Sequence, residues 1–102
     1  GELNKETVKR ALALLQIDEA GLSAPDRKIL ETIIGKFSGG PVGLSTIAAA
    51  ISEEESTVEE VHEPYLMQLG LLERTSRGRM ATRRAYEHLG FDIPEENQER
   101  LL

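Results

Sequence analysis

Apolar side chains recur with helical spacing near the start of the chain. Over residues 4 to 16, aliphatic residues lie three or four positions apart, at Val8, Leu12 and Leu15. This spacing places their side chains on one face of a helix. We therefore predict a helix over these residues, ending before Gly21.

The next helix is marked by residues that start and stop it. Ser23 and Asp26 form the Ser-x-x-Asp pattern of a capping box, and Pro25 falls in the first turn. A helix is therefore predicted from Ser23 to the sequence Gly39-Gly40-Pro41, through which no helix continues. Its predicted buried stripe consists of Ile29, Leu30, Ile33, Ile34 and Phe37.

A short extended stretch and two more helices are predicted before residue 71. Val42 and Leu44 form the extended stretch, and a brief helix over residues 45 to 51 follows. The sequence Ser56-Thr57-Val58-Glu59 is a second capping box, so a longer helix is predicted to begin there and to stop at Gly70. The predicted apolar side of this longer helix is Val58, Val61, Tyr65 and Leu69.

Pro64 lies inside this longer helix. A proline within a helix removes one backbone hydrogen bond and costs about 3 kcal/mol. We therefore predict a kink between Glu60 and Pro64, or a helix that restarts at Pro64.

Two short runs, residues 71–75 and 79–82, flank the sequence Ser76-Arg77-Gly78. Gly78 can take a positive φ there, so the three residues are predicted to form the turn of a β-hairpin. A last short helix is predicted after the hairpin, capped by Thr82 and closed by Gly90.

This order of helix, short strand, two helices and hairpin predicts a winged helix, which is a helix-turn-helix carrying a β-hairpin wing. The predicted fold class is mostly α with a small β-hairpin. With 102 residues and 39% apolar side chains, the chain fits one compact core, which excludes a multidomain enzyme. No uninterrupted apolar run is longer than that from Ile47 to Ile51, so we expect a soluble chain with no membrane span.

Charge is distributed unevenly along the chain. The net charge is −6, yet the stretch from Arg74 to Arg84 carries +5 with no acidic residue, which leaves −11 on the rest. The stretch from Glu53 to Glu63 holds six glutamates and no lysine or arginine. An acidic domain with one basic strip is compatible with DNA binding, whereas an evenly acidic domain is not.

The hairpin arginines are the candidate DNA-binding residues. Arg74 and Arg79 are predicted to lie directly or diagonally across the hairpin, with Arg77 at its tip. Like charges so placed repel one another, and no acidic residue nearby in sequence relieves them, so a polyanion is their expected partner. The alternative is that arginines on hairpin edges only discourage strand pairing between molecules.

The helix that opens at Ser56 is predicted to expose Glu59, Glu60 and Glu63. Three carboxylates close to phosphates are unfavourable, so we expect this helix to point away from DNA and the wing to carry the binding. Contacts would then be mainly to the DNA backbone or minor groove, with little dependence on sequence. The alternatives for these glutamates are a capping role and a docking face for a basic partner.

No pattern in the chain indicates catalysis, a cofactor or a metal. The glycine-rich sequence Gly39 to Gly43 lacks the Lys-Ser/Thr ending of a Walker motif, so it is interpreted as a turn. His62 and His88 have no nearby Cys or His companions and are interpreted as packing or surface residues. With no cysteine in the chain, a thiolate zinc site and a cysteine nucleophile are excluded.

From about Ala20 to Leu89 the chain closely resembles the C-terminal region of the RuvB family of bacterial Holliday-junction branch-migration motors. The resemblance lies in Gly21-Leu22, Asp26-Arg27, GGPVGLSTIAAAI (39–51), EPYL (63–66) and LGLLERTSRGRMATRRAYEHLG (69–90). It implies that residues 1–20 are the last helix of an AAA+ lid domain. Residues 21–90 would then be a winged-helix DNA-binding domain. The resemblance does not extend to residues 91–102, whose polar composition predicts a tail.

The resemblance also implies partners and contacts. In this family an ATPase domain uses ATP and magnesium, six subunits encircle duplex DNA, and RuvA loads them at Holliday junctions in the bacterial cytoplasm. This chain lacks that domain and is not expected to hydrolyse ATP by itself. The family's wing contacts correspond to Arg74 and Arg79, with Arg77 beside them and Arg83 and Arg84 as weaker candidates. Glu55 stands where some members have an arginine, which argues against a DNA contact from that loop.

Two other functions remain open from the sequence. A free-standing winged-helix transcription regulator would need a dimer interface and a basic recognition helix. A protein-binding winged helix would use the acidic stretch from Glu53 to Glu63 and pair its arginines with carboxylates of a partner.

Overall fold

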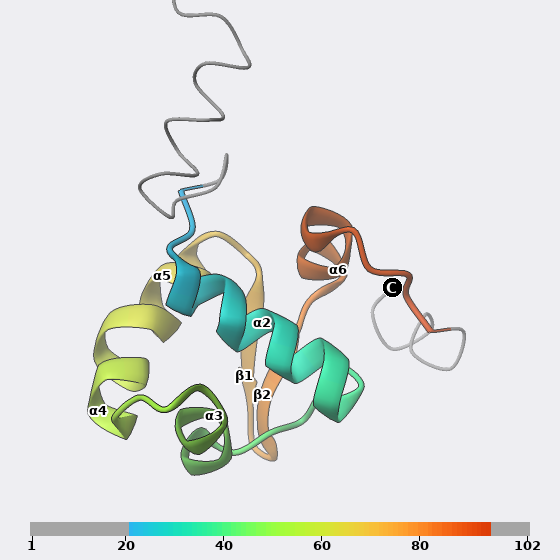
Figure 1. The fold of residues 1–102 in the computed structure, drawn as a ribbon. Helices are drawn as coiled ribbons and strands as arrows, with labels where there is room; N and C mark the ends of the chain where they lie inside the picture. The colour runs from blue at the N-terminus through green and yellow to red at the C-terminus, as the bar shows by residue number, and fades with distance from the viewer. Residues whose placement is uncertain (1–20, 95–102) are drawn as a thin grey trace, which may run out of the picture.

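The computed structural model describes residues 21–94, which form a helical domain with one β-hairpin (Figure 1). The predicted helix over residues 4–16 and the tail from residue 95 lie outside the described residues. The elements are α2 (Ala24–Phe37), α3 (Leu44–Ile51), α4 (Glu55–Thr57), the π-helical turn η1 (Val58–His62), α5 (Glu63–Gln68), β1 (Leu72–Thr75), β2 (Gly78–Ala81) and α6 (Arg83–Leu89). This order confirms the prediction of a mostly helical winged helix.

Helix α2 begins as its capping residues predict. The backbone N–H of Ser23 donates to Asp26 Oδ2 at 3.0 Å, and the N–H of Asp26 donates to Ser23 Oγ at 3.3 Å. The helix ends at Phe37, because Ser38 takes the left-handed conformation and stops it before the glycines. Phe37 was predicted to be buried and is 37% exposed, whereas Ile34, in the same last turn of α2, is buried as predicted.

The connection between α2 and α3 runs along the hairpin. Val42 and Arg79 exchange two backbone hydrogen bonds, of 2.9 and 2.7 Å, and the N–H of Ala81 donates to the carbonyl of Gly39. Val42 therefore forms the predicted extended stretch. Leu44 does not belong to it, because α3 already begins at Leu44 with Gly43 as its N-cap.

The predicted capping box at Ser56 and Glu59 is wrong. The N-cap is Glu54, whose carbonyl accepts the N–H of Val58 at 3.1 Å, so Ser56 lies inside the first turn. The helix begins earlier because α3 ends in the left-handed residue Ser52, and only a short link separates the two helices.

The predicted distortion before Pro64 is present as the π-helical turn η1. The N–H of Glu63 donates to the carbonyl of Val58, five residues back, so the turn holds one residue more than an α-helical turn. The extra residue shifts the buried face by one position. Val58, Glu63 and Leu66 are therefore fully buried, whereas Val61, which was predicted on the apolar side, is 59% exposed.

The hairpin pairs Leu72 with Ala81, Glu73 with Met80, Arg74 with Arg79 and Thr75 with Gly78. The turn thus consists of Ser76 and Arg77 alone, and Gly78 is already part of β2. Its φ is +138°, and a Cβ placed on it would lie 2.6 Å from the carbonyl oxygen of Val42. Gly78 is needed here because the 39–42 segment approaches β2 so closely.

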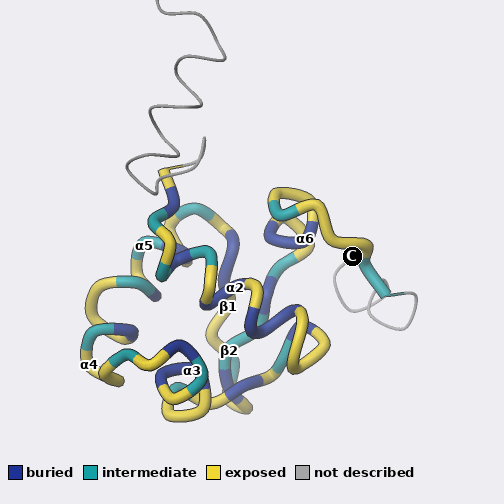
Figure 2. Tube along the Cα trace, viewed as in Figure 1, coloured by how far each residue is buried: buried dark blue, intermediate teal, exposed yellow. Residues whose placement is uncertain are grey.

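The core lies between α2 and the hairpin and extends to the helices that flank them (Figure 2). The predicted α2 residues Ile29, Leu30 and Ile33 are fully buried in it. Helix α6 adds Ala85 and Tyr86, and Thr82 caps it as predicted, because Thr82 Oγ1 accepts the N–H of Ala85 at 3.2 Å. Among residues 21–94, no helix is long and apolar enough to span a bilayer.

We predict that Gly78→Ala lowers the free energy of unfolding by about 2 to 3 kcal/mol, because the added methyl group meets the Val42 backbone at a positive φ. Gly35→Ala is the control. Gly35 lies inside α2 with open space around it, so alanine there should stabilise the chain by about 1 kcal/mol. Urea denaturation followed by circular dichroism measures both, and equal stability of the two variants would contradict the close approach.

Candidate nucleic-acid interface

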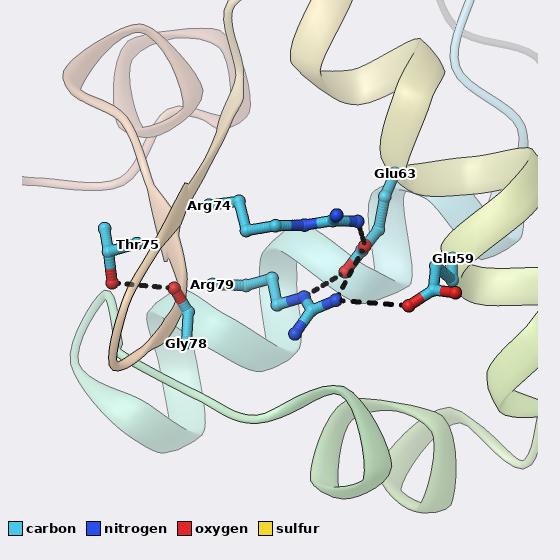
Figure 3. A network of polar contacts seen from close by, with 6 residues as sticks. All are labelled: Glu59, Glu63, Arg74, Thr75, Gly78 and Arg79. Atoms are coloured by element: carbon cyan, nitrogen blue, oxygen red, sulfur yellow. Dashed lines mark hydrogen bonds and ion pairs between the residues drawn. The ribbon is translucent and has the colours of Figure 1, made fainter.

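Arg74 and Arg79 lie directly opposite each other on β1 and β2, as one of the two predicted arrangements requires. Residues directly opposite in an antiparallel pair send their side chains to the same face of the sheet. Both guanidinium groups extend from the hairpin toward the junction of η1 and α5 (Figure 3). The strand register alone would therefore hold two positive charges side by side.

Glu63, the first residue of α5, lies between these two guanidinium groups (Figure 3). Its Oε1 accepts a hydrogen bond from Arg74 Nη2 at 2.5 Å. Arg79 donates twice, from Nε to Oε2 at 2.5 Å and from Nη2 to Oε1 at 3.1 Å. The Glu63 side chain has no solvent exposure, so one buried carboxylate joins both strands of the hairpin to α5.

Two expectations from the sequence are therefore wrong. Glu63 is buried instead of exposed, and it supplies the acidic partner that was expected to be missing. Glu63 is 11 and 16 positions from the two arginines, so charges that are neighbours in the chain give no sign of this contact. The π-helical turn that shifts the buried face of the helix brings Glu63 beneath the hairpin.

Arg79 and Arg74 differ in solvent exposure and in the number of hydrogen bonds that they make to Glu63. The Arg79 side chain is 14% exposed, and a second carboxylate oxygen, Glu59 Oε2, lies 3.8 Å from its Nη2. The hydrogen bond to Glu63 raises the pKa of Arg79 above its ordinary value, although desolvation opposes the shift. The Arg74 side chain is 44% exposed and touches Glu63 through Nη2 alone.

Arg77 lies at the tip of the hairpin and is exposed. Its backbone N–H donates to Thr75 Oγ1 at 3.2 Å, and the same hydroxyl donates to the carbonyl of Gly78 at 2.8 Å. Thr75 therefore fixes the turn through the backbone and leaves the Arg77 side chain out of the network. No ion pair to Arg77 forms within residues 21–94, so the tip is cationic.

Arg83 and Arg84 do not join this group. They open α6, at the end of β2 opposite the turn, so the arginine strip of the sequence is divided between two ends of the hairpin (Figure 1). Arg83 Nε lies 3.2 Å from Glu87 Oε1 in an exposed ion pair one helical turn away. Arg84 is exposed.

A polar contact between His62 and Asp26 was not predicted from the sequence. His62 Nδ1 lies 2.7 Å from Asp26 Oδ1, and both side chains are largely buried. The contact connects η1 to the capping box of α2, which is a structural role. No group of three His, Asp or Glu side chains placed to hold a metal ion occurs among residues 21–94.

Comparison with known proteins places these residues in a family. The family model described as the RuvB C-terminal winged helix domain matches residues 19–90. Proteins named Holliday junction branch migration complex subunit RuvB are 58% identical over 95 residues in Chloroflexus aggregans and 56% identical over 96 residues in Nostoc punctiforme. These matches cover 93% and 94% of this chain, but only 27% and 26% of the relatives.

Solved structures agree with this family. The structure of the Thermotoga maritima RuvB Holliday junction branch migration motor is 48% identical in sequence and superposes with a TM-score of 0.82. It covers 91% of this chain, and this chain covers 31% of it.

We predict that Glu63→Ala lowers the free energy of unfolding by about 3 kcal/mol, because it leaves two guanidinium groups opposed and Arg79 largely desolvated without its partner. Glu60→Ala removes the same charge from an exposed position of η1 and should change stability by no more than about 0.5 kcal/mol. Chemical denaturation of both variants is the measurement. A Glu63→Ala variant as stable as Glu60→Ala would show that the buried carboxylate does not hold the hairpin.

Proposed function

The chain belongs to the RuvB C-terminal winged helix domain family, and from this premise we propose that it is the part of a RuvB protein that holds duplex DNA. It spans about a quarter of the length of the curated relatives it matches. We assign residues 21–90 to the DNA-binding domain, residues 1–20 to the end of an AAA+ lid domain, and residues 91–102 to a tail.

The rest of the proposed protein lies outside this chain. By family resemblance it is a bacterial cytoplasmic branch-migration motor that hydrolyses ATP with magnesium and acts at Holliday junctions in recombination and repair. Its proposed partners are RuvA and five further copies of itself in a ring. In this scheme the 102-residue chain has no catalytic role and supplies contacts to the DNA.

The observation that carries the proposed DNA contact is the cationic tip of the hairpin. Arg77 is exposed there with no acidic partner among residues 21–94. Arg74 lies on β1, close to the turn, and its side chain is 44% exposed. Planar guanidinium groups bind phosphate oxygens through paired N–H donors. Arg77 and Arg74 are therefore the proposed phosphate ligands, and Arg79 supports them from below the hairpin.

The acidic helix supports backbone contact over base recognition. A recognition helix normally presents Arg, Lys, Asn or Gln to the major groove. The segment from Glu55 to Gln68 instead exposes Glu55, Glu59 and Glu60, which phosphates would repel. We therefore propose that the wing makes the main contact and that binding depends little on DNA sequence. Arg83 and Arg84, at the far end of β2, are proposed as secondary phosphate contacts.

We predict that Arg77→Ala weakens binding to duplexes of unrelated sequence by the same factor, because a phosphate contact is independent of base identity. The slope of log K against log salt should become less steep by about 0.9, the value for one lost phosphate contact. Fluorescence anisotropy of labelled duplexes with the full 102-residue chain, at several salt concentrations, gives both quantities.

Lys28→Ala is the charge-matched control. Lys28 is an exposed cation on α2, outside the wing, so its loss should reduce affinity less than the loss of Arg77. Equal effects of the two substitutions would mean that general charge, not the wing, drives binding. Absence of duplex binding at low salt would favour a protein-binding winged helix, and loss on a single sequence would favour a transcription regulator.

A further inference from the structure

We infer that Glu63 is a positioning residue of the DNA interface, which locks Arg79 beneath the hairpin and presents Arg74 to a single phosphate group. The inference rests on the proposed function and assigns different roles to two arginines that the sequence treats alike. It follows from the unequal contacts that Glu63 makes with them (Figure 3).

Arg79 is held at several points. Its Nε and Nη2 donate to the two oxygens of Glu63, Nη2 lies near Glu59, and its backbone pairs with Val42 as well as with Arg74. With 14% of its side chain exposed, it offers a phosphate much less surface than Arg74 does. Arg79 therefore has a structural role, which is to connect the hairpin to α5.

Arg74 is held at one point only. Its Nη2 donates to Glu63 Oε1, and the other N–H donors of its guanidinium are not used by Glu63. The side chain is 44% exposed, so these donors are within reach of a ligand. The single contact fixes the direction of a long side chain before DNA arrives, which removes part of the ordering cost of binding.

The contribution of this group to DNA binding is one of position. Arg79 is paired with Glu63 and lies near Glu59, so the two guanidinium groups and two carboxylates carry no net charge, and the unused N–H donors of Arg74 are what the group offers to a phosphate. Without the carboxylate, two opposed cations would repel and Arg74 would turn away from its position beside Arg79. Loss of Glu63 should therefore weaken DNA binding even though it makes the chain less acidic.

Charge and positioning predict opposite changes in DNA affinity when Glu63 is neutralised, so an experiment can distinguish them. Glu63→Gln and Glu60→Gln each remove one negative charge from the same helical segment, and only Glu63 contacts the arginines. If charge alone matters, both substitutions tighten duplex binding slightly. If Glu63 positions Arg74, Glu63→Gln weakens binding by roughly three- to tenfold while Glu60→Gln does not.

A second set of variants, made in a chain that carries Arg74→Ala, distinguishes the loss of Arg74 positioning from damage to the fold. In an Arg74→Ala chain, Glu63→Gln should change the affinity no more than Glu60→Gln does, because the residue it positions is gone. Circular dichroism melts establish that each variant is folded at the titration temperature. If Glu63→Gln fails to fold, Arg79→Lys replaces it, since lysine keeps the charge and lacks the planar pair of Nε and Nη2 donors that Arg79 gives to Glu63.

The inference is overturned if Glu63→Gln binds duplex as tightly as Glu60→Gln, or if it weakens binding equally with and without Arg74. Wild-type binding that falls with Arg77→Ala but does not respond to Glu63→Gln would overturn this inference and leave the proposed function standing. A wild-type chain that binds no duplex at low salt would overturn both.

Discussion

A buried carboxylate between two opposed arginines is the constraint on which the wing depends. Glu63 has no solvent exposure and binds Arg74 and Arg79 from the two strands of the hairpin. The backbone of Arg79 also pairs with Val42, so the same residue joins the segment before α3 to the sheet. Removing the charge of Glu63 alone should lower the stability of the fold, because the arginine charges left behind lose their partner and Arg79 stays largely shielded from water.

The proline of the helix explains how that carboxylate reaches its place. Pro64 has no N–H to donate to the carbonyl of Glu60, and the helix widens into the π-helical turn η1 just before it. The extra residue moves Glu63 and Leu66 onto the buried face and moves Val61 off it. A local backbone irregularity thus selects which acidic side chain of a glutamate-rich segment meets the wing.

The sequence predicted most of the features that depend on neighbouring residues, with the cap at Ser56 as the exception. The caps at Ser23 and Thr82 and the hairpin were correct, and the direct pairing of Arg74 with Arg79 is one of the two arrangements predicted, because cap and turn chemistry acts within a few positions. It failed for Glu63, whose partners lie 11 and 16 positions away. Two arginines facing each other across a hairpin were the available signal, since such a pair requires an anion, and the protein itself supplies one.

The central claim is that Arg77 and Arg74 meet phosphate while Glu63 retains Arg79. The most direct measurement is the set of arginine Nε–Hε resonances of the 102-residue chain during titration with an unlabelled duplex. The account predicts large shifts for Arg77 and Arg74 and an almost unchanged signal for Arg79. A shift of Arg79 as large as that of Arg77, or shifts confined to arginines outside the hairpin such as Arg27 on α2, would contradict it.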